Sequence, residues 1–218
     1  MKKIVVIVFI VLFSAGYSFS QEMEMKTSKG MMPHQLYTGT WNSVFPLGDF
    51  NKWVNSPSAA GFGFGARFFI DKGFNAGFNI GWQRVSKAYG YETYYGENGS
   101  AVTATNYRFT WMVPLQVTAG YMFWPAKIVS PYIEIGIGGD YMEHHLIVQE
   151  YDFYEKRWDF SLTPEIGALF KFGYYSSWGA LVAFNYKWTS NTIQLLDNKK
   201  SKMLSMLGLR IGICVIVN

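Results

Sequence analysis

The stretch Ala60–Trp82, AGFGFGARFFIDKGFNAGFNIGW, alternates between apolar residues and small or polar residues with few exceptions. Because a β-strand turns successive side chains to opposite sides, the pattern predicts two strands joined by a short turn at Asp71–Gly73. One face is rich in phenylalanine and isoleucine, and the other carries glycine, asparagine and Arg67. An apolar face opposite a crowded polar face is typical of a transmembrane β-barrel.

The same alternation recurs in further segments, which we expect to form the remaining strands of one barrel. These segments cover residues 37–47, 108–123, 133–140, 160–171, 178–188 and 207–217. The connections after the first, third, fifth and seventh strands are long, and the others are short. Long extracellular loops and short periplasmic turns alternate in this way in outer-membrane barrels. The predicted fold is all-β, an eight-stranded antiparallel up-and-down transmembrane β-barrel.

Two prolines interrupt the predicted strands. Pro114 and Pro164 lie where a proline removes a hydrogen bond from the ladder. Since a closed barrel has no edge strand to accommodate a proline, we expect a bulge or a local break in pairing at each.

The N-terminus predicts export. Lys2 and Lys3 precede the apolar run Ile4–Phe13, and Ser18–Ser20 places small residues where a signal peptidase reads them. The apolar run is about half the roughly 20 residues that a membrane-spanning helix needs. The expected organisation is a signal peptide over residues 1–20, a flexible periplasmic lead over 21–36 and a barrel domain over 37–218.

Composition argues against several classes of protein. The full chain has 19 lysine and arginine and 15 aspartate and glutamate residues, a formal net charge of +4. Without Lys2 and Lys3 of the predicted signal peptide the charge is +2, which is too balanced to suggest a nucleic-acid partner. Cys214 is the only cysteine, so an intrachain disulfide cannot form. We expect no cofactor, and no metal site, because two adjacent histidines without a clear third ligand do not make one.

Alternation alone leaves open which face points outward, since a soluble ligand-binding barrel has the same pattern with its apolar face inside. A glycine-rich face suits a crowded barrel interior and would make a poor solvated surface. Aromatic residues lie near the strand ends of the apolar face, as in the girdles at the two membrane interfaces. The expected girdle residues are Trp82, Trp111, Tyr121, Trp178, Tyr186 and Trp188.

On these features the chain resembles the small outer-membrane β-barrels of the OmpA/OmpX type, and the outer-membrane β-barrel domain family more broadly. The resemblance covers roughly Tyr37–Asn218 and includes Trp41–Phe50, WNSVFPLGDF. It implies a monomer in the outer membrane of a Gram-negative-type bacterium, in contact with outer-membrane lipid and lipopolysaccharide. It also implies insertion by the barrel-assembly machinery, although the chain ends in Asn218 where many members end in an aromatic residue.

Charged residues fall on the predicted inward face, namely Arg67, Arg108, Glu134, Asp140, Glu165, Lys171, Lys187 and Arg210. An eight-stranded interior is just wide enough for side chains to fill, so we expect ion pairs across a packed polar lumen. The favoured interpretation is a polar core that holds the barrel closed. The alternative is a gate that opens when the pairs rearrange.

Two of the predicted extracellular loops cover residues 87–105 and about 149–157. The loops carry aromatic and basic residues, namely Tyr89, Tyr91, Tyr94, Tyr95, Tyr151, Phe153, Tyr154, Lys199, Lys200 and Lys202. Tyrosine among small residues makes effective contact surfaces, and lysines can pair with lipopolysaccharide phosphates. Loops that are merely solvated are an equal alternative. We predict a non-enzymatic barrel that contributes to envelope integrity or surface interaction, with a narrow OmpW-like channel for small solutes as the alternative.

A lipid-modifying enzyme is a third hypothesis, because His144 and His145 follow Glu143 near the outer end of the fifth strand. Such an enzyme needs a nucleophile beside a histidine and an orienting carboxylate. No nearby serine is evident, and adjacent residues of a strand face opposite sides. We therefore predict that both histidines are loop or strand-end residues, and we assign no catalytic residue.

Overall fold

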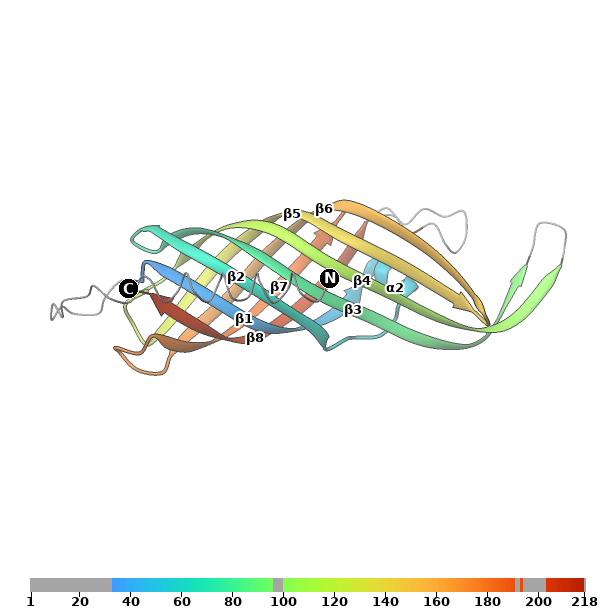
Figure 1. Ribbon diagram of the computed structural model, residues 1–218, viewed down its shortest axis with the longest axis horizontal. Coiled ribbons are helices and arrows are strands. Elements are labelled where there is room, and N and C mark those ends of the chain that lie inside the picture. Colours follow the sequence, from blue (N-terminus) through green and yellow to red (C-terminus); the bar gives the residue numbers. More distant parts are fainter. Residues whose placement is uncertain (1–32, 96–99, 191–192, 194–202, 218) are drawn as a thin grey trace, which may run out of the picture.

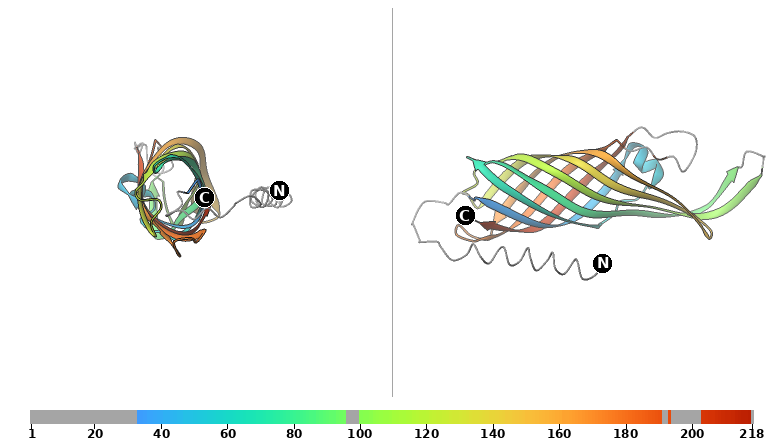
Figure 2. Two further views of the ribbon diagram at one scale, coloured as in Figure 1. Left: turned by 90° about the vertical axis from the view of Figure 1, so that its left-hand side faces the viewer. Right: turned by 45° about the horizontal axis from the view of Figure 1, so that its top comes forward.

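The computed structural model describes residues 33–95, 100–190, 193 and 203–217. The predicted signal peptide and most of the predicted lead lie outside the described residues. The strands close into a barrel in chain order, β1 to β8, and β8 pairs with β1 (Figures 1 and 2). All of the pairs are antiparallel, so the predicted up-and-down barrel is confirmed.

The strands differ in length by almost a factor of two. The short strands are β1 (Gln35–Leu47), β2 (Ala60–Asp71), β7 (Trp178–Thr189) and β8 (Leu204–Val217). The long strands are β3 (Phe74–Tyr95), β4 (Ala101–Met122), β5 (Val129–Val148) and β6 (Tyr151–Lys171). The long strands are neighbours, so one side of the barrel extends far beyond the other (Figures 1 and 2).

A short helix, α2 (Gly48–Trp53), lies between β1 and β2 at the end where the long strands protrude (Figure 2). Within the described ranges, no helix is long and apolar enough to cross a membrane.

The strand register determines how steeply the strands tilt. Tyr37 pairs with Ala66, and following the paired residues once around the barrel returns to β1 at Leu47. This displacement corresponds to a tilt of about 40°, given about 3.3 Å per residue and about 4.8 Å between strands. At this tilt, a stretch of about ten residues spans about 25 Å along the barrel axis, which matches the height of the apolar band of a membrane barrel.

Side-chain exposure shows which face points outward. Phe62 and Phe64 are 50% and 49% exposed, whereas Arg67 and Glu134 are 3% and 6% exposed. The apolar face is therefore the outer surface, and the arrangement of a soluble ligand-binding barrel is excluded.

Glycines on the inner face make room for polar side chains of the neighbouring strand. A Cβ atom at Gly61 would lie 1.9 Å from Gln83 Oε1, and one at Gly208 would lie 2.3 Å from Asn185 Oδ1. The glycine-rich pattern in the sequence thus reflects the crowding of a narrow lumen.

Both prolines interrupt the hydrogen-bonded ladder on one side. The β3–β4 pairing is interrupted opposite Pro114, and the β6–β7 pairing is interrupted at Pro164. The register is the same on the two sides of each interruption. Each proline therefore causes a local break in pairing and no bulge, which is one of the two predicted outcomes.

The predicted turn between the second and third strands is present as Lys72 and Gly73. Gly73 has a φ of 107°, and a Cβ there would lie 2.3 Å from the carbonyl oxygen of Met122, so only glycine fits. At the start of the barrel, β1 begins at Gln35, inside the predicted lead.

Candidate functional site

Glu165 lies at the centre of a buried ion-pair network in the lumen. Its carboxylate lies 2.7 Å from Arg210 Nη1 and 3.4 Å from Arg67 Nη2. It also accepts a hydrogen bond of 2.7 Å from Tyr132 Oη. A second carboxylate, that of Glu134, pairs with the same Arg67 guanidinium. Charges from β2, β5, β6 and β8 therefore compensate one another across the barrel.

A further ion pair lies toward the extracellular end of this network. Lys187 Nζ lies 2.8 Å from the Asp140 carboxylate, which also accepts a hydrogen bond of 2.9 Å from Ser161 Oγ. We call this group of paired charges the polar layer; its members are Arg67, Glu134, Asp140, Glu165, Lys187 and Arg210.

Lys171 differs from the expected ion pairing, and Arg108 packs against aromatic rings. Lys171 donates a hydrogen bond of 2.8 Å to the carbonyl oxygen of Pro125, in the turn between β4 and β5. The guanidinium of Arg108 lies over the rings of Tyr89 and Trp53, 4.3 Å and 5.5 Å from the ring centroids. The alternation predicts that these side chains point inward, but it does not show which distant segment lies opposite them.

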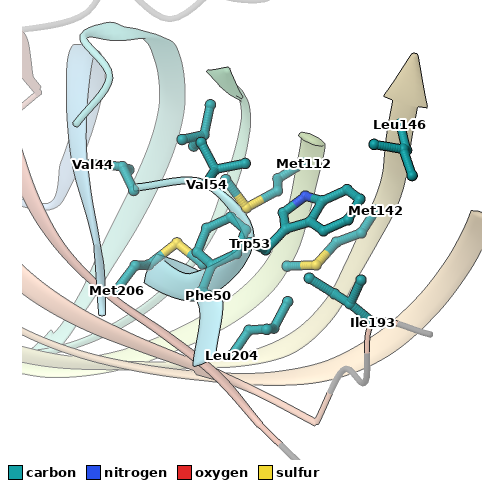
Figure 3. Close-up of a cluster of buried hydrophobic side chains, with 11 residues drawn as sticks. Val44, Phe50, Trp53, Val54, Met112, Met142, Leu146, Ile193, Leu204 and Met206 are labelled. Carbon is teal, nitrogen blue, oxygen red and sulfur yellow. The ribbon is translucent and has the colours of Figure 1, made fainter. Parts of the chain in front are cut away.

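The lumen is packed, but it is not polar from end to end as predicted. At the extracellular mouth, α2 inserts Phe50 and Trp53 among inward-facing side chains of the strands (Figure 3). We call this cluster the upper plug; it consists of Val44, Phe50, Trp53, Val54, Val85, Met112, Met142, Leu146, Ile193, Leu204 and Met206. The lower plug, near the periplasmic end, consists of Leu36, Met122, Tyr132, Leu169, Leu181, Ala183, Cys214 and Ile216. The polar layer therefore lies between two apolar layers.

Hydrogen bonds anchor α2 to the barrel wall. Trp53 Nε1 donates to Thr110 Oγ1 at 3.1 Å, and Thr110 Oγ1 lies 2.8 Å from His144 Nδ1. The hydroxyl of Tyr89 donates to the Trp53 carbonyl oxygen at 3.1 Å. The signal that could have revealed this helix is the spacing of Phe50 and Trp53, three residues apart, which places both apolar side chains on one helical face.

His144 and His145 point to opposite sides of β5, as the alternation predicts. His144 is fully buried in the lumen. His145 is on the outer surface, stacked on Phe109 with the ring centroids 4.3 Å apart and 3.0 Å from the Asp152 carboxylate. Because β5 continues to Val148, both histidines lie inside the strand, which corrects the expectation of loop or strand-end residues. Over the described ranges, no group of three histidine, cysteine, aspartate or glutamate side chains is arranged to hold a metal ion.

Glu143 is the centre of a polar group on the outer surface that the sequence did not reveal. Its carboxylate accepts a hydrogen bond of 2.5 Å from Tyr141 Oη and lies 3.2 Å from Lys156 Nζ. The hydrogen bond from Tyr141, together with Lys156, holds the pKa of Glu143 below its ordinary value. The same carboxylate raises the pKa of Lys156.

The predicted girdle residues lie on the outer surface. Trp111 and Tyr121 are at opposite ends of one stretch of β4, and Trp178 and Trp188 are at opposite ends of β7. Each pair spans about ten residues, or about 25 Å of height at the observed tilt, as expected for residues at the two interfaces of a membrane. Trp82 and Tyr186 also face outward; Trp82 stacks on the exposed Phe62.

The largest difference from the sequence prediction lies at the extracellular end. The predicted loop over Lys87–Thr105 is mostly a continuation of β3 and β4, and only Gln149 and Glu150 separate β5 from β6. These hairpins are stabilised by cross-strand contacts such as that between the hydroxyls of Thr93 and Thr103, 2.8 Å apart. Such contacts become visible only once the register is known.

The predicted contact residues are distributed unequally over these hairpins. Tyr89 packs on Arg108 in the barrel mouth. The exposed side chains are those of Tyr91, Tyr151, Phe153 and Tyr154, with exposed fractions of 80%, 70%, 52% and 60%. The side chains of Tyr94 and Tyr95, and all of Lys199, Lys200 and Lys202, lie outside the described part of the structure.

Comparison with protein-family profiles and with curated protein sequences finds no match. Among solved structures, the outer membrane protein OprG from Pseudomonas aeruginosa is 10% identical, with a TM-score of 0.50 over 88% of this chain and 100% of that chain. The fold is that of an outer-membrane β-barrel.

Two further solved structures are similar in the same way. Neisserial surface protein A is 10% identical, with a TM-score of 0.49 over 85% of this chain and 98% of that chain. Ail, the attachment invasion locus protein of Yersinia pestis, is 13% identical, with a TM-score of 0.43 over 84% of this chain and 99% of that chain. At such low identity the likeness concerns the fold alone.

Proposed function

We propose that this chain is an outer-membrane barrel with a closed lumen, and that it binds a partner at the cell surface, without catalysis, through its protruding sheet. The observation that carries the proposal is the continuation of β3–β6 beyond their neighbours. β2 pairs with β3 only as far as Arg84, and β7 pairs with β6 only as far as Ser161. Beyond these residues the four long strands project roughly 25 Å further, at about 3.3 Å per residue and the observed tilt (Figure 2).

The two edges of the protruding sheet are not equivalent. On the β3 edge, Lys87 Nζ and Tyr89 Oη donate hydrogen bonds to the carbonyl oxygens of Asn55 and Trp53, so the α2 segment covers its lower part. On the β6 edge, residues 151–159 have no neighbouring strand other than β5 within the described ranges.

The β6 edge combines the two features that a protein-binding edge needs. A strand edge with no further strand beside it within the described residues offers backbone donors and acceptors to an added strand. The aromatic side chains along it are more than half exposed and supply contact area at low entropic cost: Tyr151, Phe153, Tyr154 and Trp158. We therefore propose β6 as the contact edge.

A closed lumen is supported by the upper plug, the polar layer and the lower plug, which fill the barrel in series. A narrow channel, the alternative function, requires both plugs to move. Folded protein in planar lipid bilayers should therefore show no conductance. Discrete, reproducible conductance steps would contradict the closed lumen and favour the channel.

We also propose that the barrel is a monomer and that its outer wall contacts lipopolysaccharide. The charged residues of the outer wall support this contact. Arg84, Trp111, Glu143 and Lys156 align in register across β3–β6, just beyond the aromatic Trp82. Arg84 rests on the ring of Phe109 at 4.9 Å. The guanidinium of Arg84 and the ammonium of Lys156 both lie on the outer wall beyond Trp82, where they can pair with lipid phosphates.

The contact edge is tested by a variant that removes its exposed aromatics, Tyr151→Ser, Phe153→Ser and Tyr154→Ser. The matched control is Tyr174→Ser with Tyr175→Ser, since these side chains are 65% and 89% exposed at the opposite end. Cells that display each protein are measured for adherence to surfaces coated with lipopolysaccharide, sulfated polysaccharide or extracellular-matrix protein. Loss of adherence in the β6 variant alone is expected. Equal adherence of wild type and both variants would refute the proposal.

A further inference from the structure

A small cavity lies between the polar layer and the upper plug. Its volume is about 80 Å³, and its lining includes Glu165 and Arg210 from the polar layer and Met112 and Met206 from the upper plug. On the scale of 10–15 Å³ per water molecule, it has room for roughly five to eight waters or one small solute. The cavity is therefore large enough to hold a guest, and its walls are polar on one side and apolar on the other.

Unsatisfied hydrogen-bonding groups from three strands line this cavity. Asn42 Oδ1, Gln83 Oε1 and Arg210 Nε are buried and have no hydrogen-bond partner among the described residues. All three residues belong to the cavity lining. Because buried polar groups are almost always hydrogen-bonded, two unsatisfied acceptors and one unsatisfied donor on residues that line one cavity favour a guest that both donates and accepts.

The charge of the surrounding residues restricts the guest further. The polar layer contains three cations, Arg67, Lys187 and Arg210, each of which is paired with a carboxylate of Glu134, Asp140 or Glu165. A guest with a net charge would leave an uncompensated charge in the lumen, which is costly at this depth. The balanced layer therefore favours a neutral guest.

The upper plug separates the cavity from the extracellular side. Val44, Met112 and Met206 belong both to the cavity lining and to the cluster around Phe50 and Trp53 (Figure 3). Since α2 contributes those two rings and is a single short helix, it is the smallest element whose displacement would expose the cavity.

We propose that this cavity binds a neutral, hydrogen-bonding guest, either a cluster of water molecules or one small uncharged polar solute, and that α2 is its extracellular lid. The proposal is independent of the protruding sheet. It therefore stands whether or not the β6 edge binds a partner.

The guest is tested with three probes of similar size and different charge: acetamide, acetate and ethylammonium. The barrel is refolded in detergent with each probe, and the side-chain amide resonances of Asn42 and Gln83 are followed by NMR. Asn75 is the internal control, because its amide donates to the Gly73 carbonyl oxygen at 3.2 Å and does not line the cavity.

If the guest is a solute, acetamide alone shifts both cavity amides and leaves Asn75 unchanged. If the guest is water, no probe shifts them, and both amides show cross-relaxation with long-lived water. The proposal is overturned if a charged probe shifts them as much as acetamide, or if neither a probe nor water contacts them. For the lid, Phe50→Ala should accelerate exchange of the guest in the folded barrel, and an unchanged exchange rate would exclude that role for α2.

Discussion

Replacement of Glu165 by glutamine is the most direct test of whether the buried ion pairs hold the lumen closed. In the wild-type barrel two guanidiniums, those of Arg67 and Arg210, lie between two carboxylates, those of Glu134 and Glu165. Glutamine keeps the shape of the side chain but removes one negative charge. The buried network is then left with an unbalanced positive charge.

The expected loss of stability follows from the burial of this ion-pair network. Loss of one partner from a buried ion pair costs about 3–5 kcal/mol. The amide oxygen of glutamine can still accept the hydrogen bond from Tyr132. We therefore expect the free energy of unfolding to fall by about 3 kcal/mol, the lower end of this range, which is roughly a hundredfold in the folding equilibrium. Glu143→Gln is the matched control, because Glu143 pairs on the outer surface with a half-exposed Lys156, and such pairs contribute about 1 kcal/mol or less.

The measurement is reversible urea unfolding in lipid vesicles, followed by tryptophan fluorescence, with bilayer conductance recorded on the same proteins. A double variant, Glu165→Gln with Arg210→Gln, restores the balance of charge and should recover part of the lost stability. If Glu165→Gln costs no more than Glu143→Gln, the network does not hold the barrel closed. Unchanged stability with a new conductance would make the network a gate.

Two further predictions concern the upper plug and the outer surface. Phe50→Ala should destabilise the barrel by about 3–5 kcal/mol, because it leaves a cavity in a fully buried cluster, whereas Phe184→Ala on the lipid-facing surface should cost less in the same unfolding assay. The pKa of Glu143 in the folded barrel lies below the ordinary pKa that it has in the unfolded chain. Glu143 therefore contributes its full stabilisation at a pH above the ordinary pKa, and this stabilisation is lost as the pH falls through the lower pKa of the folded state. Glu143→Gln should remove this part of the acid dependence of unfolding, and an identical pH profile for the variant would contradict the assigned hydrogen bond.

Several properties of this protein follow from local sequence alone. Alternation in Ala60–Trp82 predicts strands because the side-chain period of a β-strand is two, whatever surrounds it. The glycines opposite the aromatic residues predict which face is inside, since only a narrow lumen needs side chains that small. The inward position of Arg67 and Glu165 follows from the same alternation.

Other properties depend on which distant residues reach the same height in the barrel. The register brings Arg67, Glu134, Glu165 and Arg210 together, although their strands are far apart in sequence, and places Lys171 beside a turn instead. The sequence does not predict the long hairpins, because their stability comes from cross-strand pairs and the turn-like composition of residues 87–105 predicts a loop.

The sequence by itself therefore determined the barrel, its orientation toward lipid and its inward charges, because each of these is set by a repeat of two residues along one strand. Only the tertiary structure decided which side chains fill the lumen. The α2 helix has only six residues, so its Phe50 and Trp53 are stabilised by packing against residues such as Met112, Met142 and Met206 on strands that folding brings around them. The same is true of the β6 edge, because only the register shows that the β6–β7 pairing ends at Ser161 and Thr189, well short of Tyr151.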